Sequence, residues 1–306
     1  MKILIYGVGG IGGFIGAFLC KTKYEVFFLS RGQNFLNLKK NGLNLKSSKE
    51  SLKFKKINVS NKLEDFNNLD IVILCVKLYD FKSCLLNLTK VINKNTIILP
   101  FQNGIIAEQL IREIYGSRNN FGAVAQISSH LDEYSKVIHK GNLATFFVGP
   151  LLCKENDDKN EKLINFCNEL ASVGLDMRYT EKINQKLWDK FIFLSAYSGM
   201  TTLTEMSIGE IFENNTLKKM FIKAMKETLN LSKMYRISFQ YNPVKKWEEK
   251  IHNMPYDMTS SMYLDFKNNK RLELDWLSGS VVKLSQKFKL ISSTHQYIVE
   301  NIHSVK

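Results

Sequence analysis

The sequence lacks the cysteine and histidine patterns of several function classes. Its five cysteines include no C-x-x-C pair, and its five histidines show no spacing typical of metal ligands. The G-x-S-x-G turn that carries the nucleophile of many serine hydrolases is also absent. We therefore expect no metal site and no serine-hydrolase chemistry. An odd number of cysteines, several of them in apolar runs, is typical of buried thiols in a reducing compartment, which predicts a cytoplasmic protein.

The sequence has fewer acidic than basic residues, but it lacks the arginine clusters and aromatic ladders of nucleic-acid-binding proteins. The formal net charge is +14, from 43 basic and 29 acidic residues. Most of the excess is lysine scattered among asparagines, as in NLKKNGLNLKSSKESLKFKK. An RNA-binding protein would show arginine clusters and aromatic side chains that stack on bases. We therefore expect no nucleic-acid partner, although a basic surface would attract anionic substrates and cofactors.

Long uncharged runs are missing beyond the opening, MKILIYGVGGIGGFIGAFLC, in which residues 3–20 carry no charge. This run is long enough to be considered as a membrane span. Six of its residues are glycines, however, and each costs about 1 kcal/mol inside a helix. A secretion signal would need a leucine-rich centre and a small-residue cleavage site. The glycine content favours a strand, a turn and a helix instead, so we predict no membrane association.

The glycine-rich run predicts a nucleotide-binding turn. Residues 3–6 are a short strand, residues 14–21 are a helix, and the turn between them has the pattern G-x-G-x-x-G. The first glycine permits the tight turn, the second lets a pyrophosphate approach, and the third lets helix and strand pack closely. The pyrophosphate would lie at the helix N-terminus. The predicted cofactor-binding residues here are Gly7, Val8, Gly9, Gly10, Ile11 and Gly12.

A second predicted strand, within residues 23–32, indicates which cofactor binds. Sites for NAD usually place an acidic residue at the end of this strand, whereas sites for NADP place an arginine near the 2′-phosphate. Here the residues are Ser30 and Arg31. An arginine can hold a phosphate with two hydrogen bonds, so we predict NADPH/NADP as the cofactor, with both residues in contact with it. The alternative is a solvated surface arginine.

The remaining sequence predicts an α/β protein with two domains. Strands and helices alternate up to residue 115, which is typical of a Rossmann-type, doubly wound parallel sheet. Strands within residues 120–150 are expected at the edge of that same sheet, followed by a helix at 160–172 and a strand at 175–179. From residue 181 only helical patterns remain. We predict a nucleotide-binding domain at residues 1–180 and an all-helical substrate and catalytic domain at 181–306.

Several separated motifs resemble one family, the ketopantoate reductases (2-dehydropantoate 2-reductases). The resemblance extends from the glycine-rich turn to about residue 290. Each motif alone is weak evidence, but the order and spacing of the set are specific. The motifs are G-x-G-x-x-G at residues 7–12, V-K at 76–77, Q-N-G at 102–104, L-W-x-K at 187–190, S-S-M at 260–262 and E-x-D at 273–275.

The resemblance implies a role for each polar residue. Lys190 would be the general acid that protonates the substrate carbonyl oxygen, and Glu273 would hold the substrate hydroxyl and orient Lys190. Ser261 would bind the substrate carboxylate, while Lys77 and Asn103 would position both nicotinamide and substrate. Both Lys77 and Asn103 follow predicted strands at their carboxyl ends, where open α/β sheets bind ligands. Without the resemblance, a lysine and a glutamate on amphipathic helices would be read as solvated surface residues.

One departure from the family pattern bears on the substrate. The family commonly has asparagines four and eight residues after the catalytic lysine, where they contact substrate, and this chain has Leu194 and Ser198. Losing an amide at a buried polar site costs about 1 to 3 kcal/mol. Ser198 remains a predicted substrate contact. The expected activity is NADPH-dependent reduction of ketopantoate to (R)-pantoate, in pantothenate and coenzyme A biosynthesis.

The sequence leaves two alternatives open. One keeps the mechanism and changes the substrate to another branched 2-oxo acid with a more apolar tail. The other is a protein that senses NADPH without turning it over, although such a protein would need neither Lys190 nor Glu273. The expected partner is a small 2-oxo acid, and the expected state is a monomer or a homodimer.

Overall fold

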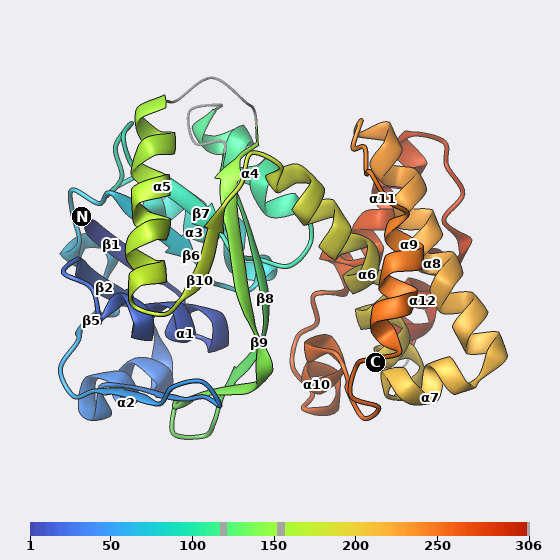
Figure 1. Cartoon of the computed structure of the whole chain (residues 1–306), viewed down its shortest axis with the longest axis horizontal. Helices are drawn as coiled ribbons and strands as arrows, with labels where there is room; N and C mark the ends of the chain where they lie inside the picture. Colours follow the sequence, from blue (N-terminus) through green and yellow to red (C-terminus); the bar gives the residue numbers. More distant parts are fainter. Residues whose placement is uncertain (117–120, 152–156, 305–306) are drawn as a thin grey trace. The chain divides into compact units, whose positions relative to one another are not determined.

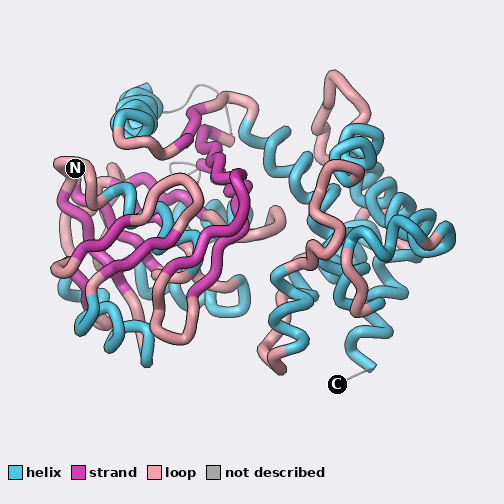
Figure 2. Tube along the Cα trace, turned by 60° about the horizontal axis from the view of Figure 1, so that its bottom comes forward, coloured by secondary structure: helices cyan, strands magenta, loops and turns pink. Residues whose placement is uncertain are grey.

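The computed structural model describes residues 1–116, 121–151 and 157–304 (Figure 1). The chain forms two compact units. Unit 1 comprises Met1–Gln102 and Ala107–Ile183, and unit 2 comprises Asn103–Ile106 and Asn184–Lys306. Strands occur in unit 1, whereas the described part of unit 2 is mostly helical (Figure 2). The prediction of a Rossmann-type sheet followed by a helical region is confirmed.

The first sheet of unit 1 is entirely parallel, with the strand order β5-β2-β1-β6-β7. The chain runs outward from β1 to β2 and β5, then returns to the other side of β1 as β6 and β7. The order therefore reverses between β1 and β6, and ligands of such sheets bind beyond the carboxyl ends of the strands at this point. The strands are β1 (Lys2–Tyr6), β2 (Glu25–Leu29), β5 (Asn58–Ser60), β6 (Ile71–Leu74) and β7 (Ile97–Pro100).

Helices accompany this sheet as the alternating pattern predicted. All four residues of β6 and all four of β7 are buried, as expected of parallel strands covered on both faces. The glycine-rich helix α1 packs tightly, because a Cβ on Gly16 would lie 2.4 Å from the ring of Phe28. The helices are α1 (Gly10–Leu19), α2 (Gly32–Asn41), α3 (Leu78–Leu88), α4 (Ile106–Tyr115) and α5 (Asp157–Ser172), with a 3-10 turn η1 (Leu63–Asp65).

A second sheet corrects one prediction. We expected the strands within 120–150 to extend the edge of the parallel sheet, and this is wrong, because they form a separate mixed sheet. The long strand β9 pairs with β8 along one edge, antiparallel, and with β3 and β10 along the other. The backbone hydrogen bonds of β9 are thus made with strands of this second sheet. The strands are β3 (Leu43–Lys46), β4 (Leu52–Phe54), β8 (Phe121–Leu131), β9 (Val137–Pro150) and β10 (Asp176–Tyr179).

Unit 2 is organised around α6 (Ile183–Thr204), a helix of 22 residues. Phe191, Ile192, Ala196 and Met200 on this helix are each 0–1% exposed, so α6 is buried on several faces. The other elements pack into one apolar core with it. They are α7 (Ile208–Glu213), α8 (Asn215–Met234), α9 (Pro243–Ile251), α10 (Ser261–Lys267), η3 (Leu274–Trp276), α11 (Ser278–Lys287) and α12 (Ser293–Ser304).

The described helices and cysteines bear on two expectations from the composition, membrane association and the state of the thiols. None of the described helices combines the length and the apolar character that a membrane span requires. The thiols of Cys20, Cys75, Cys84 and Cys167 are free, and those of Cys84 and Cys167 are buried. Burial raises the pKa of the Cys167 thiol to about 12, so this side chain behaves as a small apolar group. Cys153 lies outside the described residues.

Candidate active site

The glycine-rich turn has the geometry that a phosphate-binding loop requires. Gly7 has a φ of +98°, and a Cβ there would lie 2.9 Å from the backbone carbon of Cys75. A Cβ on Gly12 would lie 2.2 Å from the carbonyl oxygen of Gly7. By contrast, a Cβ on Gly9 would meet nothing within 4 Å. The protein itself therefore requires glycine at positions 7 and 12, while Gly9 leaves an open approach to the backbone.

The N-terminus of α1 is available to an anion. Gly9 is the residue that precedes the helix, it has no side chain, and no acidic residue occurs in the first turn. Gly10 packs against the second sheet, because a Cβ there would lie 2.3 Å from the carbonyl oxygen of Ser129. Unsatisfied first-turn N–H groups and the helix dipole together favour binding of a phosphate. The turn thus fits the pyrophosphate of a dinucleotide.

Asn34 connects the glycine-rich turn to the end of β2. Its Nδ2 donates to the carbonyl oxygen of Val8 at 2.8 Å and to Oγ of Ser30 at 3.0 Å. Ser30 is only 7% exposed, so its hydroxyl is held within this contact. The Oδ1 atom of Asn34 is buried and has no hydrogen-bond partner. Buried polar atoms are normally paired, and this one provides an acceptor beside the turn.

Charged residues flank the same edge of the parallel sheet. Arg31 directly precedes α2, and its guanidinium forms an ion pair with Oδ2 of Asp80 in the first turn of α3. Lys77 directly precedes α3, two residues after Cys75, and is half-buried. As predicted, it follows the carboxyl end of β6.

The Gln-Asn-Gly turn follows β7 and reaches unit 2. Gln102 belongs to unit 1, and its Nε2 donates to the carbonyl oxygen of Val76 at 3.0 Å. Asn103 begins the short segment that belongs to unit 2. There the Nζ atom of Lys190 on α6 donates to Oδ1 of Asn103 at 2.9 Å. Lys190 and Asn103, both predicted site residues, are 87 positions apart in the sequence and in direct contact in the structure.

Gly104 lets this turn lie against the segment that carries Glu273. It has a φ of +93°, and a Cβ there would lie 3.2 Å from the carbonyl oxygen of Trp276 and 3.9 Å from Cε2 of Phe191. Glu273 directly precedes η3 and is 6% exposed. Asn103, Gly104, η3 and α6 thus meet in one region of unit 2.

A hydrogen bond ties the start of α10 to the same helix. Oγ1 of Thr201 on α6 donates to Oγ of Ser260 at 2.7 Å, and Ser260 also caps α10 by accepting from the N–H of Tyr263. Both serine and threonine hydroxyls are buried. This places Ser261, whose side chain is exposed, next to the C-terminal half of α6. Ser198 lies one turn before Thr201 and is 1% exposed.

Lys190 and Leu194 occupy the same face of α6, because residues four apart lie one turn above each other. Both side chains are half-buried, although Phe191 and Ser195 beside them are fully buried. The apolar, partly accessible side chain of Leu194 therefore lies one turn after Lys190, at the position where the family pattern has an asparagine.

Sequence reasoning assigned no role to four residues that contact or adjoin predicted site residues, two in each unit. They are Asn34, Asp80, Thr201 and Ser260. Ser260 is part of the S-S-M motif, and its role could have been predicted, because a serine before a helical run is a typical N-cap. The others act through contacts with residues distant in sequence, for which the chain itself carries no signal.

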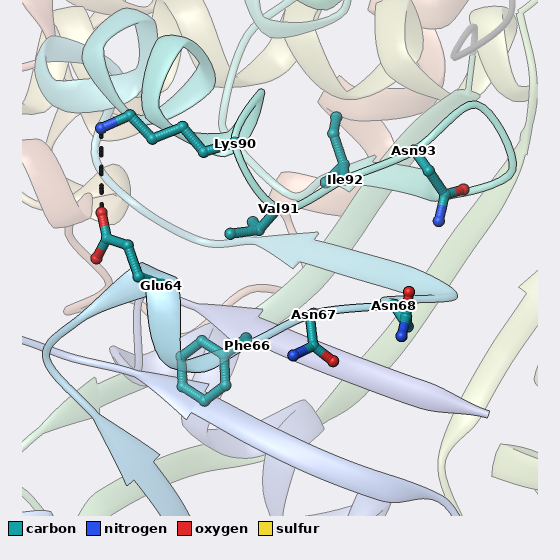
Figure 3. Close-up of a pocket in the computed structure, with 8 residues that line it drawn as sticks. All are labelled: Glu64, Phe66, Asn67, Asn68, Lys90, Val91, Ile92 and Asn93. Carbon is teal, nitrogen blue, oxygen red and sulfur yellow. Dashed lines mark ion pairs between the residues drawn. The ribbon is translucent and has the colours of Figure 1, made fainter.

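A hollow lies at the opposite edge of the parallel sheet (Figure 3). Its volume is about 340 Å³, and it is flanked by the segments that enter β6 and β7 at their amino ends. Glu64 and Lys90 on its rim form an ion pair at 4.0 Å. None of the predicted site residues lines it. The lining residues are Glu64, Phe66, Asn67, Asn68, Lys90, Val91, Ile92 and Asn93.

Sequence comparison relates almost the whole chain to oxidoreductases. It is 24% identical over 302 residues to the uncharacterized oxidoreductase YkpB of Bacillus subtilis, covering 99% of this chain and 98% of that one. It is 27% identical over 309 residues to the 2-dehydropantoate 2-reductase of Aquifex aeolicus, covering 99% of this chain and 96% of that one.

Structure and family comparison agree with this relationship. The fold matches the ternary structure of D-mandelate dehydrogenase with NADH and anilino(oxo)acetate, with a TM-score of 0.88 at 21% identity, over 99% of this chain and 98% of that one. The family model "Ketopantoate reductase PanE/ApbA" matches residues 3–151, and the model of its C-terminal part matches residues 182–306. The chain therefore belongs to the ketopantoate reductase PanE/ApbA family and is an NAD(P)-dependent oxidoreductase.

Proposed function

We propose that this protein uses NADPH to reduce the 2-oxo group of ketopantoate to (R)-pantoate, a step of pantothenate and coenzyme A biosynthesis. The observation that carries the proposal is the hydrogen bond from Lys190 Nζ to Asn103 Oδ1 at 2.9 Å. A half-buried ammonium donating to an amide oxygen is held where it can also serve a substrate carbonyl oxygen.

The reaction divides into a hydride and a proton transfer. NADPH, when bound, supplies the hydride to the carbonyl carbon of the substrate. Lys190 stabilises the developing negative charge on the carbonyl oxygen and donates the proton, a contribution worth typically about 100-fold to 10,000-fold. Glu273 orients Lys190 and accepts from the substrate hydroxyl, and Ser261 and Ser198 contact the substrate carboxylate and chain.

The cofactor contacts proposed from unit 1 fit the geometry of the glycine-rich turn. The open approach at Gly9 and the uncapped N-terminus of α1 support pyrophosphate binding. Lys77 and Asn103 follow the ends of β6 and β7 and are proposed to position the nicotinamide and the substrate. The backbone of the turn and the end of β2 complete the set, which comprises Gly7, Val8, Gly9, Gly10, Ile11, Gly12, Ser30 and Arg31.

A second candidate substrate keeps this mechanism and changes the acid. Leu194 is half-buried one turn after Lys190, and it cannot donate a hydrogen bond to a hydroxylated substrate. The related D-mandelate dehydrogenase structure contains anilino(oxo)acetate, an oxamate that resembles a 2-oxo acid with an aromatic tail. An apolar 2-oxo acid is therefore the alternative that this residue favours.

Lys190→Ala is the first test. NADPH consumption is measured with ketopantoate and with a panel of aliphatic and aryl 2-oxo acids, and NADPH binding is measured by calorimetry. We expect turnover to fall by about 100-fold or more, while the dissociation constant for NADPH stays within about twofold. Lys186→Ala, one turn earlier on α6, is the matched control and should retain activity.

The outcomes separate the candidates. Preference for ketopantoate in the wild type establishes the proposed reaction, and preference for an aryl 2-oxo acid establishes the second candidate. If NADPH binds but no acid in the panel reacts, the protein is a sensor and both proposals fail. Activity that survives in Lys190→Ala would remove the lysine from the mechanism.

A further inference from the structure

The ion pair between Arg31 and Asp80 bears on which nicotinamide nucleotide the protein selects. The side chain of Arg31 is 79% exposed, whereas that of Asp80 is 25% exposed. The carboxylate is thus the more firmly placed partner, and it holds a guanidinium that would otherwise extend into solvent. Since Arg31 is the residue proposed to recognise the 2′-phosphate, its existing partner is an anion that competes with that phosphate.

The pair lies at the edge of the sheet where the nucleotide is proposed to bind. Arg31 follows β2 and Asp80 lies in the first turn of the helix after β6, and these two strands flank β1 on its two sides. Tyr6, the last residue of β1, lies within the field of both groups. Burial and then a hydrogen bond with Cys84 raise the pKa of the Tyr6 hydroxyl, Arg31 lowers it and Asp80 raises it. Arg31 and Asp80 therefore follow the carboxyl ends of the two strands that flank β1, the strand that leads into the glycine-rich turn.

A carboxylate at this position affects NADPH and NADH in opposite ways. NADPH carries an additional phosphate with a charge of about −1.5 to −2, which a neighbouring carboxylate repels. NADH has a 2′-hydroxyl there instead, and a carboxylate accepts a hydrogen bond from such a hydroxyl. Arg31 favours NADPH and Asp80 favours NADH, and in this chain the two side chains are in contact with each other.

We propose that Asp80 is a selectivity residue for the cofactor: its carboxylate competes with the 2′-phosphate of NADPH for Arg31 and accepts from the ribose hydroxyl of NADH. The inference rests on the proposed nucleotide site of unit 1. It assigns the protein a dual use of NADPH and NADH, with a weaker preference for NADPH than Arg31 alone would give. Asp80 tunes this preference through its charge rather than through the fold.

The test measures dissociation constants for NADPH and NADH by calorimetry in the absence of any 2-oxo acid. Asp80→Asn keeps the size of the side chain and removes its charge. We expect it to tighten NADPH binding and weaken NADH binding, so that the ratio of the two constants changes by about tenfold in favour of NADPH. Arg31→Ala should weaken NADPH by about tenfold and leave NADH within about twofold.

Glu64→Gln is the matched control, because it removes a carboxylate with an ion-pair partner at the opposite edge of the same sheet. It should leave the ratio unchanged. Asp80→Ser provides a second variant should Asp80→Asn unfold, and thermal melting identifies that case. An unchanged ratio in a folded Asp80 variant, or unchanged NADPH binding in Arg31→Ala, overturns the inference.

Failure of the inference is distinguishable from failure of the proposed function. If the wild type binds neither nucleotide, the proposed reductase activity is wrong. If the wild type binds and oxidises NADPH with a 2-oxo acid but the ratio does not respond to Asp80, only the selectivity role is wrong.

Discussion

At the scale of single residues, we expect the side chain of Leu194 on α6 to influence which acid the protein reduces. Leu194→Asn restores an amide one turn after Lys190, where the family pattern has one. A hydrogen bond of this kind contributes about 0.5–1.5 kcal/mol, so kcat/KM for ketopantoate should rise up to about tenfold relative to that for an aryl 2-oxo acid. Leu203→Asn is the matched control, because Leu203 is also half-buried on α6 but lies on the opposite face. Equal effects of both variants on the two substrates would contradict this role.

At this scale, the sequence identified residues that belong to motifs and missed residues whose contacts are with distant neighbours. Lys190 and Asn103 were both predicted, and they are in contact at 2.9 Å. Asp80 was not predicted, because an acidic residue in the first turn of a helix is common and favourable without any partner. Its importance arises from Arg31, 49 residues earlier. The site roles of the predicted residues remain predictions.

At the scale of the element, the glycines of the strand–turn–helix unit differ in what they serve. We expect Gly9 to matter for ligand binding and Gly12 to matter for folding as well. Gly9→Ala places a Cβ in open space, so we expect unfolding stability to change little and NADPH binding to weaken. Gly12→Ala places a Cβ 2.2 Å from the Gly7 carbonyl oxygen, so it should cost about 1–3 kcal/mol of stability as well. Urea unfolding and nucleotide titration of both variants check this. Equal loss of stability in both would mean that the turn responds to any side chain.

Elements were easier to predict than their pairing. The parallel strands are short apolar runs next to helical patterns, and local sequence is enough to recognise them. The second sheet was assigned wrongly, because a strand's alternation does not specify which strand it pairs with. β9 pairs with β8 and with two segments distant in sequence, and its register with β8 shifts at Ile127/Ser128. Such pairings depend on the whole fold.

At the scale of the whole molecule, we expect His295 to make stability depend on pH. It is 0% exposed, and its Nε2 lies 3.0 Å from the carbonyl oxygen of Ala224 and 3.0 Å from Oγ1 of Thr228. Burial lowers the pKa of His295, and this outweighs the opposing effects of the Glu227 carboxylate and the Ala224 carbonyl. The folded state therefore binds fewer protons than the unfolded state, in which the pKa is about 6.5. Stability should be full above that pH and fall as the pH decreases, by up to about 1.4 kcal/mol per pH unit.

His295→Gln isolates this contribution, because glutamine keeps hydrogen-bonding capacity and does not titrate. Other titrating groups remain in the variant, including Asp70, so their effects cancel in the comparison. Acidification also adds positive charge to a chain that already carries +14, and this repulsion is likewise common to both proteins. Urea unfolding between pH 7.5 and 5 should show a smaller loss of stability in the variant than in the wild type. Equal losses would mean that His295 binds its proton equally well in the folded and unfolded states.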